Sequence, residues 1–313
     1  MAEPNAEFLR KLNESDAVRA LRAERQLLED LRKANWNGVQ GAIYRDRESH
    51  KLREIDVVAH RMWQKRSRKQ DYFVRITTVA EVKSAKGYSL VFSPCGGIDL
   101  HSLQRVWLGA HEICPRMYQA TLRRCGLSGA QIRKLWKALG KEAAPNGIMI
   151  MADVCPDPPG QILMASSFQE TNSCTTKDLD ASVLWKASLA VSSAVVVLKQ
   201  SALRLAGDWM IFAARVAHDS DEDVMSTALK EVHHCVRQMY FFHPVVVIES
   251  NMFAVQEGDI MSIQACRLVR LNQFGHAVGW VDVVASHQAK EYFKMITHAY
   301  DAHFEKLKWR PIH

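Results

Sequence analysis

The alternation of apolar and polar residues divides the first third of the chain into a helix followed by strands. Leucine and valine recur at helical spacing over residues 18–31, which predicts a helix over 16–34 with Asp16 as its cap. β-branched residues then alternate with polar ones on either side of a turn at 46–49, which predicts a β-hairpin. The strand-like segments follow in the order 39–44, 53–59, 73–84 and 88–93.

The middle of the chain has a mainly helical pattern, and the last quarter is rich in strand-forming residues. Helices are predicted at 99–141, 180–206, 221–240 and 286–306. Strands are predicted at 244–248, 252–255, 260–271 and 277–285. A second hairpin is predicted around a proline-rich turn, at 147–154 and 161–168.

This order of elements predicts an α/β fold, in which strands from both ends of the chain share one mixed sheet flanked by helices. The expected core covers residues 1–110. A mainly helical insertion at 111–240 would serve substrate selection or oligomerisation. The strands and helix at 241–313 would complete or flank the core.

Composition narrows the class of protein. Hydrophobic residues make up 48% of the chain, which is enough to bury a sizeable core. The seven cysteines are odd in number and form no CxxC pair, so we expect reduced thiols in a cytoplasmic protein. No apolar signal segment is evident at the N-terminus. The most apolar stretch, 188–198, lies between Lys186 and Lys199 and is too short to span a bilayer, so we expect no membrane partner.

The charge distribution suggests a polyanionic partner. The net charge is +7, and residues 1–90 hold 19 Lys and Arg against 13 Asp and Glu. We expect a basic connector at 61–69 to bind DNA phosphates. A solvated basic loop without a partner is the alternative, and charge alone does not separate the two. The cations concerned are Arg61, Lys65, Arg66, Arg68 and Lys69.

Two predicted strands carry charged side chains within apolar sequence, which is costly unless the charges are paired or bind a metal. Asp56 lies in Arg-Glu-Ile-Asp-Val-Val-Ala, and Glu81 and Lys83 lie in Glu-Val-Lys. Asp56 and Glu81 would supply carboxylates, and Val82 its carbonyl oxygen, to Mg²⁺ or Mn²⁺. Lys83 would orient the attacking water and stabilise negative charge, or act as a base if its pKa were lowered.

A simpler interpretation of Glu-x-Lys on a strand is a cross-strand ion pair on a solvated face. The chain would then be a helical interaction protein in which this pair is accidental. The Glu54-x-Asp56 pattern in the preceding strand, together with the helix before it, favours a site instead. If the Asp56 and Glu81 carboxylates were far apart, the metal-site hypothesis would be excluded.

Residues 20–92, about a quarter of the chain, resemble the core of the PD-(D/E)XK, or restriction-endonuclease-like, superfamily. The matching strings are Arg53-Glu-Ile-Asp-Val-Val-Ala and Val79-Ala-Glu-Val-Lys-Ser. The pattern is similar to that of Mrr-type restriction enzymes and archaeal Holliday-junction resolvases. Two departures are an isoleucine in place of the common proline before Asp56, and a long, basic connector from there to Glu81.

In those relatives an early helix often supplies a further glutamate before a Gly-aromatic step. Glu24 precedes Trp36 by twelve residues and fits that place, and Glu29 is its competitor. The resemblance implies a Mg²⁺-dependent endonuclease that hydrolyses phosphodiester bonds, with DNA as the substrate. Asp56 and Glu81 would be metal ligands, Lys83 the charge-stabilising residue, and Glu24 an outer or second-metal ligand.

Other readings of the same fold stay open at this point. The chain could be a binding or regulatory subunit without turnover, or a nuclease directed at RNA. The aliphatic, serine-containing face at 188–197 is also compatible with a homo-oligomer.

Overall fold

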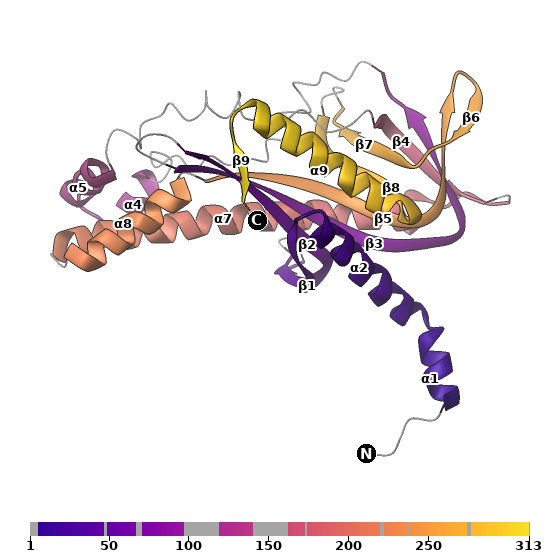
Figure 1. Cartoon of the computed structure of the whole chain (residues 1–313), viewed down its shortest axis with the longest axis horizontal. Coiled ribbons are helices and arrows are strands. Elements are labelled where there is room, and N and C mark those ends of the chain that lie inside the picture. Colours follow the sequence, from indigo (N-terminus) through magenta and orange to yellow (C-terminus); the bar gives the residue numbers. More distant parts are fainter. Residues whose placement is uncertain are drawn as a thin grey trace.

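The computed structural model describes residues 6–46, 49–66, 71–96, 119–139, 162–172, 174–219, 222–236, 238–273 and 277–312. Nine strands in these residues form one mixed sheet (Figure 1). The strands are β1 (Asn37–Arg45), β2 (Leu52–Arg66), β3 (Asp71–Pro94), β4 (Leu163–Thr171), β5 (Gln238–Gln256), β6 (Asp259–Ser262), β7 (Ala265–Leu271), β8 (Ala277–Ala285) and β9 (Arg310–Ile312). The helices are α1 (Ala6–Asn13), α2 (Asp16–Lys33), α4 (Gln119–Arg124), α5 (Gly129–Leu139), η3 (Leu179–Ala181), α7 (Val183–Asp219), α8 (Glu222–Val236), η4 (Ser286–Gln288) and α9 (Ala289–Lys306).

The sheet joins the two ends of the chain, as the element order predicts. β1, β2 and β3 pair antiparallel in sequence, and β3 then pairs parallel with β5 from the last third of the chain. β4 and β7 also pair parallel, whereas β7 and β8 pair antiparallel. The expected α/β class with a mixed sheet is therefore confirmed.

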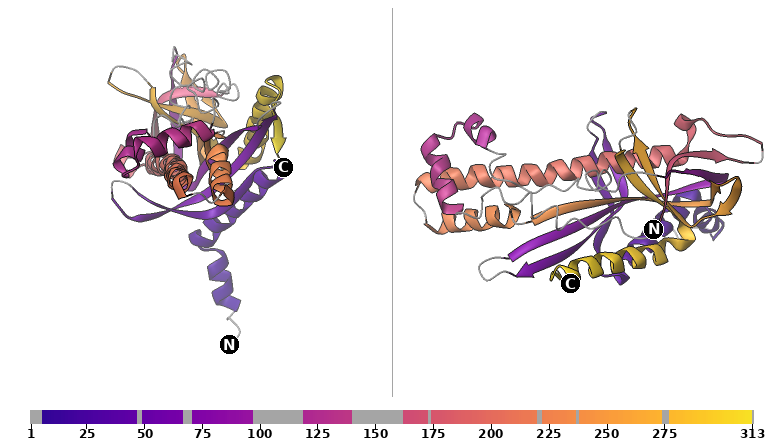
Figure 2. Two further views of the ribbon diagram at one scale, coloured as in Figure 1. Left: turned by 90° about the vertical axis from the view of Figure 1, so that its left-hand side faces the viewer. Right: turned by 90° about the horizontal axis from the view of Figure 1, so that it is seen from above.

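Helices cover both faces of the sheet, with α7 along one side and α9 along the other (Figure 2). The leucines of α2 and the aromatic face of α9 share one hydrophobic core with β2, β3 and β5. The first half of α7 packs on the opposite face, in a second core with β3, β5 and β8. Both faces of the central strands are thus buried, which explains their nearly continuous apolar sequence.

The predicted helix at 16–34 is confirmed as α2, but its cap is the preceding residue. Ser15 has extended backbone geometry, and its hydroxyl accepts from the Val18 N–H at 3.3 Å. Asp16 is instead the first helical residue, where its charge favours the positive end of the helix dipole. At the other end, Asn35 has a positive φ of 62°, and the Trp36 N–H donates to the Leu31 carbonyl at 3.0 Å. This is a Schellman motif with asparagine at its left-handed position.

The sequence suggested a connector between strands at 61–69, but residues 61–66 belong to strand β2. β2 continues to Arg66 and pairs with β3 as far as Asp71, and residues 67–70 lie outside the described part of the chain. The strand continues because Trp63 is fully buried on the inward-facing side of the alternating pattern. β2 and β3 are therefore longer than predicted, and the basic residues up to Arg66 belong to a strand.

Three further boundaries differ from the predicted ones. The segments 73–84 and 88–93 form one strand, β3, with a register irregularity between Ser84 and Ser89. The two strands predicted between 244 and 255 are likewise continuous in β5, whereas the segment 260–271 is divided into β6 and β7. Strand β9 was not predicted, since its three residues contain a proline.

The middle segment is mainly helical where the structure describes it, and it also contributes strand β4 to the sheet. The predicted helix at 99–141 corresponds only to α4 and α5, because 97–118 lies outside the described residues. The predicted hairpin cannot be assessed as such, because 147–154 also lies outside them. The second segment of that predicted hairpin, 161–168, corresponds to β4, which pairs with β3 and β7. α4, α5 and α8 gather around the distal half of α7 and share a third core with it.

Helix α7 continues to Asp219, beyond the predicted end at 206, and both Lys186 and Lys199 lie within it. Over Val183–Val216 it is long and apolar enough, by length and composition alone, to cross a membrane, and 17% of its most apolar window is buried. A single helix of this kind is weak evidence for a membrane span, because core helices outside membranes meet the same criterion. The expected shortness of this apolar stretch is therefore wrong.

A buried polar network fastens α9 to the sheet. Asp282 on β8 accepts from Arg267 Nε and Nη2, each at 2.7 Å, and from the Tyr292 hydroxyl of α9 at 2.6 Å. His243 on β5 contacts Asp282 at 2.9 Å and the Tyr300 hydroxyl at 2.6 Å. Burial lowers the pKa of His243, while the charge of Arg267 and the hydrogen bonds hold the pKa of Asp282 low in spite of its burial. Arg267 and Asp282 thus form a satisfied buried ion pair.

Candidate active site

The structure brings together the three residues of the Glu-x-Lys hypothesis. The antiparallel register pairs Val57 with Ala80, so Asp56 and Glu81 are the next residues along β2 and β3. Lys83 Nζ lies 3.0 Å from Asp56 Oδ2 and also forms an ion pair with Glu81. The condition that would have excluded the hypothesis, carboxylates far apart, is not met.

The main chain of β3 helps to fix this cluster. The Val82 N–H donates to Asp56 Oδ2 at 2.7 Å, so the same oxygen accepts from both the main chain and Lys83. The Val82 side chain packs into the core with α2 and α9. Asp56 is therefore held in place by a strand whose other face is anchored in the hydrophobic core.

Burial makes the two carboxylates unequal. Glu81 is 3% exposed, whereas the side chains of Asp56 and Lys83 are 13% and 36% exposed. Burial and, next, the charge of Asp56 raise the pKa of Glu81 to about 7, and Lys83 only partly opposes these effects. Glu81 is therefore a carboxylate that can exchange a proton near neutral pH.

Lys83 remains protonated. Burial alone would lower its pKa, but the charges of Glu81 and Asp56 outweigh burial and raise it. In the chain without a metal, this direction of the pKa does not favour the expected role of Lys83 as a base. As an ammonium group, Lys83 can donate hydrogen bonds and stabilise negative charge.

Glu24 of α2, not Glu29, belongs to this site. Gln40 Nε2 of β1 donates to Glu24 Oε2 at 2.8 Å, and Glu24 is buried. Burial raises the pKa of Glu24, and the charges of Asp56 and Glu54 add to that effect. The Glu29 side chain is 43% exposed and pairs with Arg25 at 3.2 Å. Glu24 thus lies within the electrostatic range of the cluster, while Glu29 faces solvent.

Gln40 was not predicted from the sequence as part of the site, and Glu54 was noted there only for its pattern with Asp56. Gln40 orients Glu24, and Glu54 adds negative charge beside it. Two glycines of β1 leave space for neighbouring side chains of β2. A Cβ on Gly38 would lie 2.7 Å from the Ala59 Cβ, and one on Gly41 would lie 2.8 Å from Glu54 Oε1. The Gly-x-Gln-Gly sequence of β1 was the available signal for this close approach of helix and hairpin.

The donor set fits a hard divalent cation. Within the described residues, no group of three or more His, Cys, Asp and Glu side chains is arranged to hold a metal ion. Mg²⁺ does not require such a group, because it commonly binds one or two carboxylates together with water and phosphate oxygens. Asp56 and Glu81 provide two carboxylates that share Lys83, and burial, followed by the charge of Asp56, raises the pKa of Glu81.

The five cations that were expected to bind DNA phosphates separate into three groups. Arg61 is buried, pairs with Asp301 at 2.8 Å and donates to the Ala34 and Asn35 carbonyls at the end of α2, which is a structural role. Lys65 and Arg66 are exposed at the end of the strand, where Lys65 lies over the Trp309 ring. Arg68 and Lys69 lie outside the described residues.

Comparison of the chain with protein-family models, with curated proteins and with solved structures found no match.

Proposed function

We propose that this chain is a metal-dependent nuclease of the PD-(D/E)XK type that hydrolyses phosphodiester bonds in DNA. The observation that carries the proposal is the buried Glu81 carboxylate beside Asp56, with Lys83 shared between the two. The order of the contributing elements, an acidic helix, a hairpin and a Glu-x-Lys strand in a mixed sheet, supports a restriction-endonuclease-like core.

A purely structural ion-pair cluster accounts less well for these residues. In such a cluster the cations balance the carboxylates, as Arg267 does for Asp282, whose pKa is lowered. Here Lys83 faces both Asp56 and Glu81, and the pKa of Glu81 is raised to about 7. An excess of buried negative charge costs stability, and proteins keep such arrangements at functional sites.

Asp56 and Glu81 would hold Mg²⁺ or Mn²⁺, and Glu24 would act from outside that pair through Gln40. A bound divalent cation would neutralise phosphate charge and favour ionisation of the attacking water. The Lys83 ammonium would orient the water and stabilise the charge that develops on the phosphate oxygens. The Val82 N–H keeps Asp56 in place throughout, because it donates to the carboxylate from the strand itself.

The test is digestion of plasmid DNA, single-stranded DNA and RNA by the purified chain, with Mg²⁺, with Mn²⁺ and with EDTA. We expect cleavage of DNA that depends on the metal and that Lys83→Ala abolishes. Lys86→Ala is the matched control, because Lys86 lies on the same strand but is exposed and pairs with Asp16. Binding of nucleic acid without any cleavage would indicate a non-catalytic subunit, and cleavage of RNA alone would change the substrate.

A further inference from the structure

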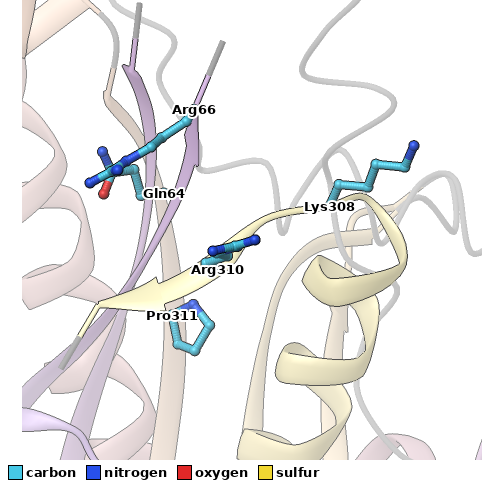
Figure 3. Close-up of a pocket in the computed structure, with 5 residues that line it drawn as sticks. All are labelled: Gln64, Arg66, Lys308, Arg310 and Pro311. Carbon is cyan, nitrogen blue, oxygen red and sulfur yellow. The ribbon is translucent and has the colours of Figure 1, made fainter.

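A basic cleft lies at the far end of β2, where the C-terminal strand joins the sheet (Figure 3). Its volume is about 480 Å³, and its lining contains three cations and no carboxylate among the residues described. β9 forms one wall, since Arg310 pairs with Gln64 and Pro311 with Trp63. The lining residues are Gln64, Arg66, Lys308, Arg310 and Pro311.

The backbone that carries these cations is firmly anchored. After α9, the Lys308 N–H donates to the Glu305 carbonyl at 2.8 Å and the Trp309 N–H to the Phe304 carbonyl at 2.8 Å. This is a second Schellman motif, and the buried Trp309 ring lies 6.3 Å from the Phe304 ring. The cations therefore project from a fixed turn beside the end of β2.

Lys308 occupies a position where lysine is unfavourable. Its φ is 63°, the left-handed conformation that glycine adopts without a penalty and that other residues rarely adopt. The matching position at the end of α2 is Asn35, a residue type that tolerates this conformation. The exposed Lys308 side chain makes no contribution to the core that would offset the strain. This unfavourable backbone conformation supports a functional role for the Lys308 side chain.

The cleft lies at a distance that suits a polymeric substrate. Arg66 is ten residues beyond Asp56 on β2, which corresponds to about 33 Å of extended strand. A DNA duplex rises about 3.4 Å per base pair, so the cleft would be roughly ten base pairs from the carboxylate site. Guanidinium and ammonium groups form charge-assisted hydrogen bonds with phosphate oxygens, and no carboxylate is among the lining residues.

We propose that this cleft binds the phosphate backbone of the nucleic acid about one helical turn from the carboxylate site. Lys308, Arg310 and Arg66 supply the charge, and Gln64 supplies a neutral donor. The site joins the two ends of the chain, so it exists only when β9 pairs with β2. The proposal rests on the nuclease function proposed above, which makes nucleic acid the partner.

The test is a salt titration of binding to a fluorescent 30-base-pair duplex in EDTA, followed by anisotropy. The double variant Lys308→Gly, Arg310→Gln should bind more weakly and flatten the slope of log affinity against log salt by roughly 1.8, about 0.9 for each phosphate contact. Lys308→Gly alone should keep or raise the melting temperature while it weakens binding. That combination separates loss of a contact from loss of folding.

Lys290→Gln is the control, because Lys290 is an exposed cation in the first turn of α9, at the opposite end from the cleft. It should leave the slope close to that of the wild type. An unchanged slope in the double variant, or an equal change in the control, would overturn the proposal. Binding in EDTA does not depend on cleavage, so the two proposals can fail separately. A flattened slope in a protein without nuclease activity would refute only the proposed function. DNA cleavage together with an unchanged slope would refute only the proposal that the cleft binds DNA.

Discussion

Lys83 Nζ lies 3.0 Å from Asp56 Oδ2 and pairs at the same time with the buried Glu81 carboxylate. One ammonium group therefore pairs with two carboxylates. Both the chemistry and the stability of the site depend on this excess of negative over positive charge.

Replacing Lys83 with alanine should reduce metal-dependent DNA cleavage by at least about 10²-fold, since a charge-stabilising donor would be lost. It should also lower the free energy of unfolding at pH 8 in EDTA by roughly 1–2 kcal/mol, less than for a fully buried pair because Lys83 is partly exposed. Urea denaturation and initial cleavage rates measure the two effects. Undiminished cleavage by this variant would remove Lys83 from the site.

The raised pKa of Glu81 predicts a pH dependence of stability without metal. The pKa of the Glu81 carboxyl is about 7 in the folded chain and 4.5 in the unfolded chain, so the folded chain binds this proton more tightly. The stabilisation that results from proton binding is complete below about pH 4.5. That effect is lost as the pH rises towards 7, and the loss amounts to about 3 kcal/mol. Urea denaturation in EDTA at pH 5 and pH 8 should show the decrease. Glu81→Gln should not show it, and an identical decrease in that variant would assign the effect to other groups.

The two candidate glutamates of α2 can be separated by isosteric substitution. Glu24→Gln should reduce cleavage by about 10- to 100-fold, as for a residue that supports metal ligands. Glu29→Gln should leave the rate unchanged, because Glu29 is exposed and contacts only Arg25 among the interactions described for it. Cleavage rates at saturating Mn²⁺ provide the comparison, and equal rates for both variants would contradict the assignment of Glu24.

The local pattern of the sequence was sufficient to predict the hairpin and the convergence of Asp56 with Glu81. Alternation along two neighbouring strands fixes which residues lie side by side, so the carboxylates and Lys83 could be placed together. The same alternation also explains the error at the basic segment. Arg61 looked like part of a solvated run, but strand periodicity turns it inward with Trp63, where it pairs with Asp301.

Long-range pairing explains most of what the sequence could not show. The pairing of β9 with β2 joins residues at opposite ends of the chain through three positions, too few for a recognisable strand pattern. The cleft formed with Lys308 and Arg310 was therefore not predicted. The network around Asp282 was also missed, because its members lie on four separate elements and only their burial reveals that they are partners.

Breaking the buried network should destabilise the fold without changing the chemistry of the site. Asp282→Asn would leave the guanidinium of Arg267 buried without its counter-ion, at a cost of about 3–5 kcal/mol. Asp259→Asn, on the exposed strand β6, should change the free energy of unfolding by less than about 0.5 kcal/mol. Urea denaturation of both variants tests this difference, and a neutral Asp282→Asn substitution would show that the ion pair adds nothing.

The most direct test of the metal site is the effect of Asp56→Asn on thermal stability. The substitution keeps the shape of the side chain and retains an oxygen that can accept from the Val82 N–H. It removes one of the two negative charges that face Lys83, so the variant should be as stable as the wild type, or slightly more stable, in EDTA.

With Mn²⁺, the wild type should become more stable than the Asp56→Asn variant. A cation that binds only the folded wild-type chain should stabilise it by about 2.7 kcal/mol at one hundred times its Kd, and the melting temperature should rise accordingly. Asp56→Asn should lose most of this rise, whereas Glu29→Gln, which removes an exposed carboxylate on α2, should retain it. An ion-pair cluster without a metal predicts no rise in any of the three proteins. An equal rise in the wild type and in Asp56→Asn would show that the ion binds elsewhere and that Asp56 is not a ligand.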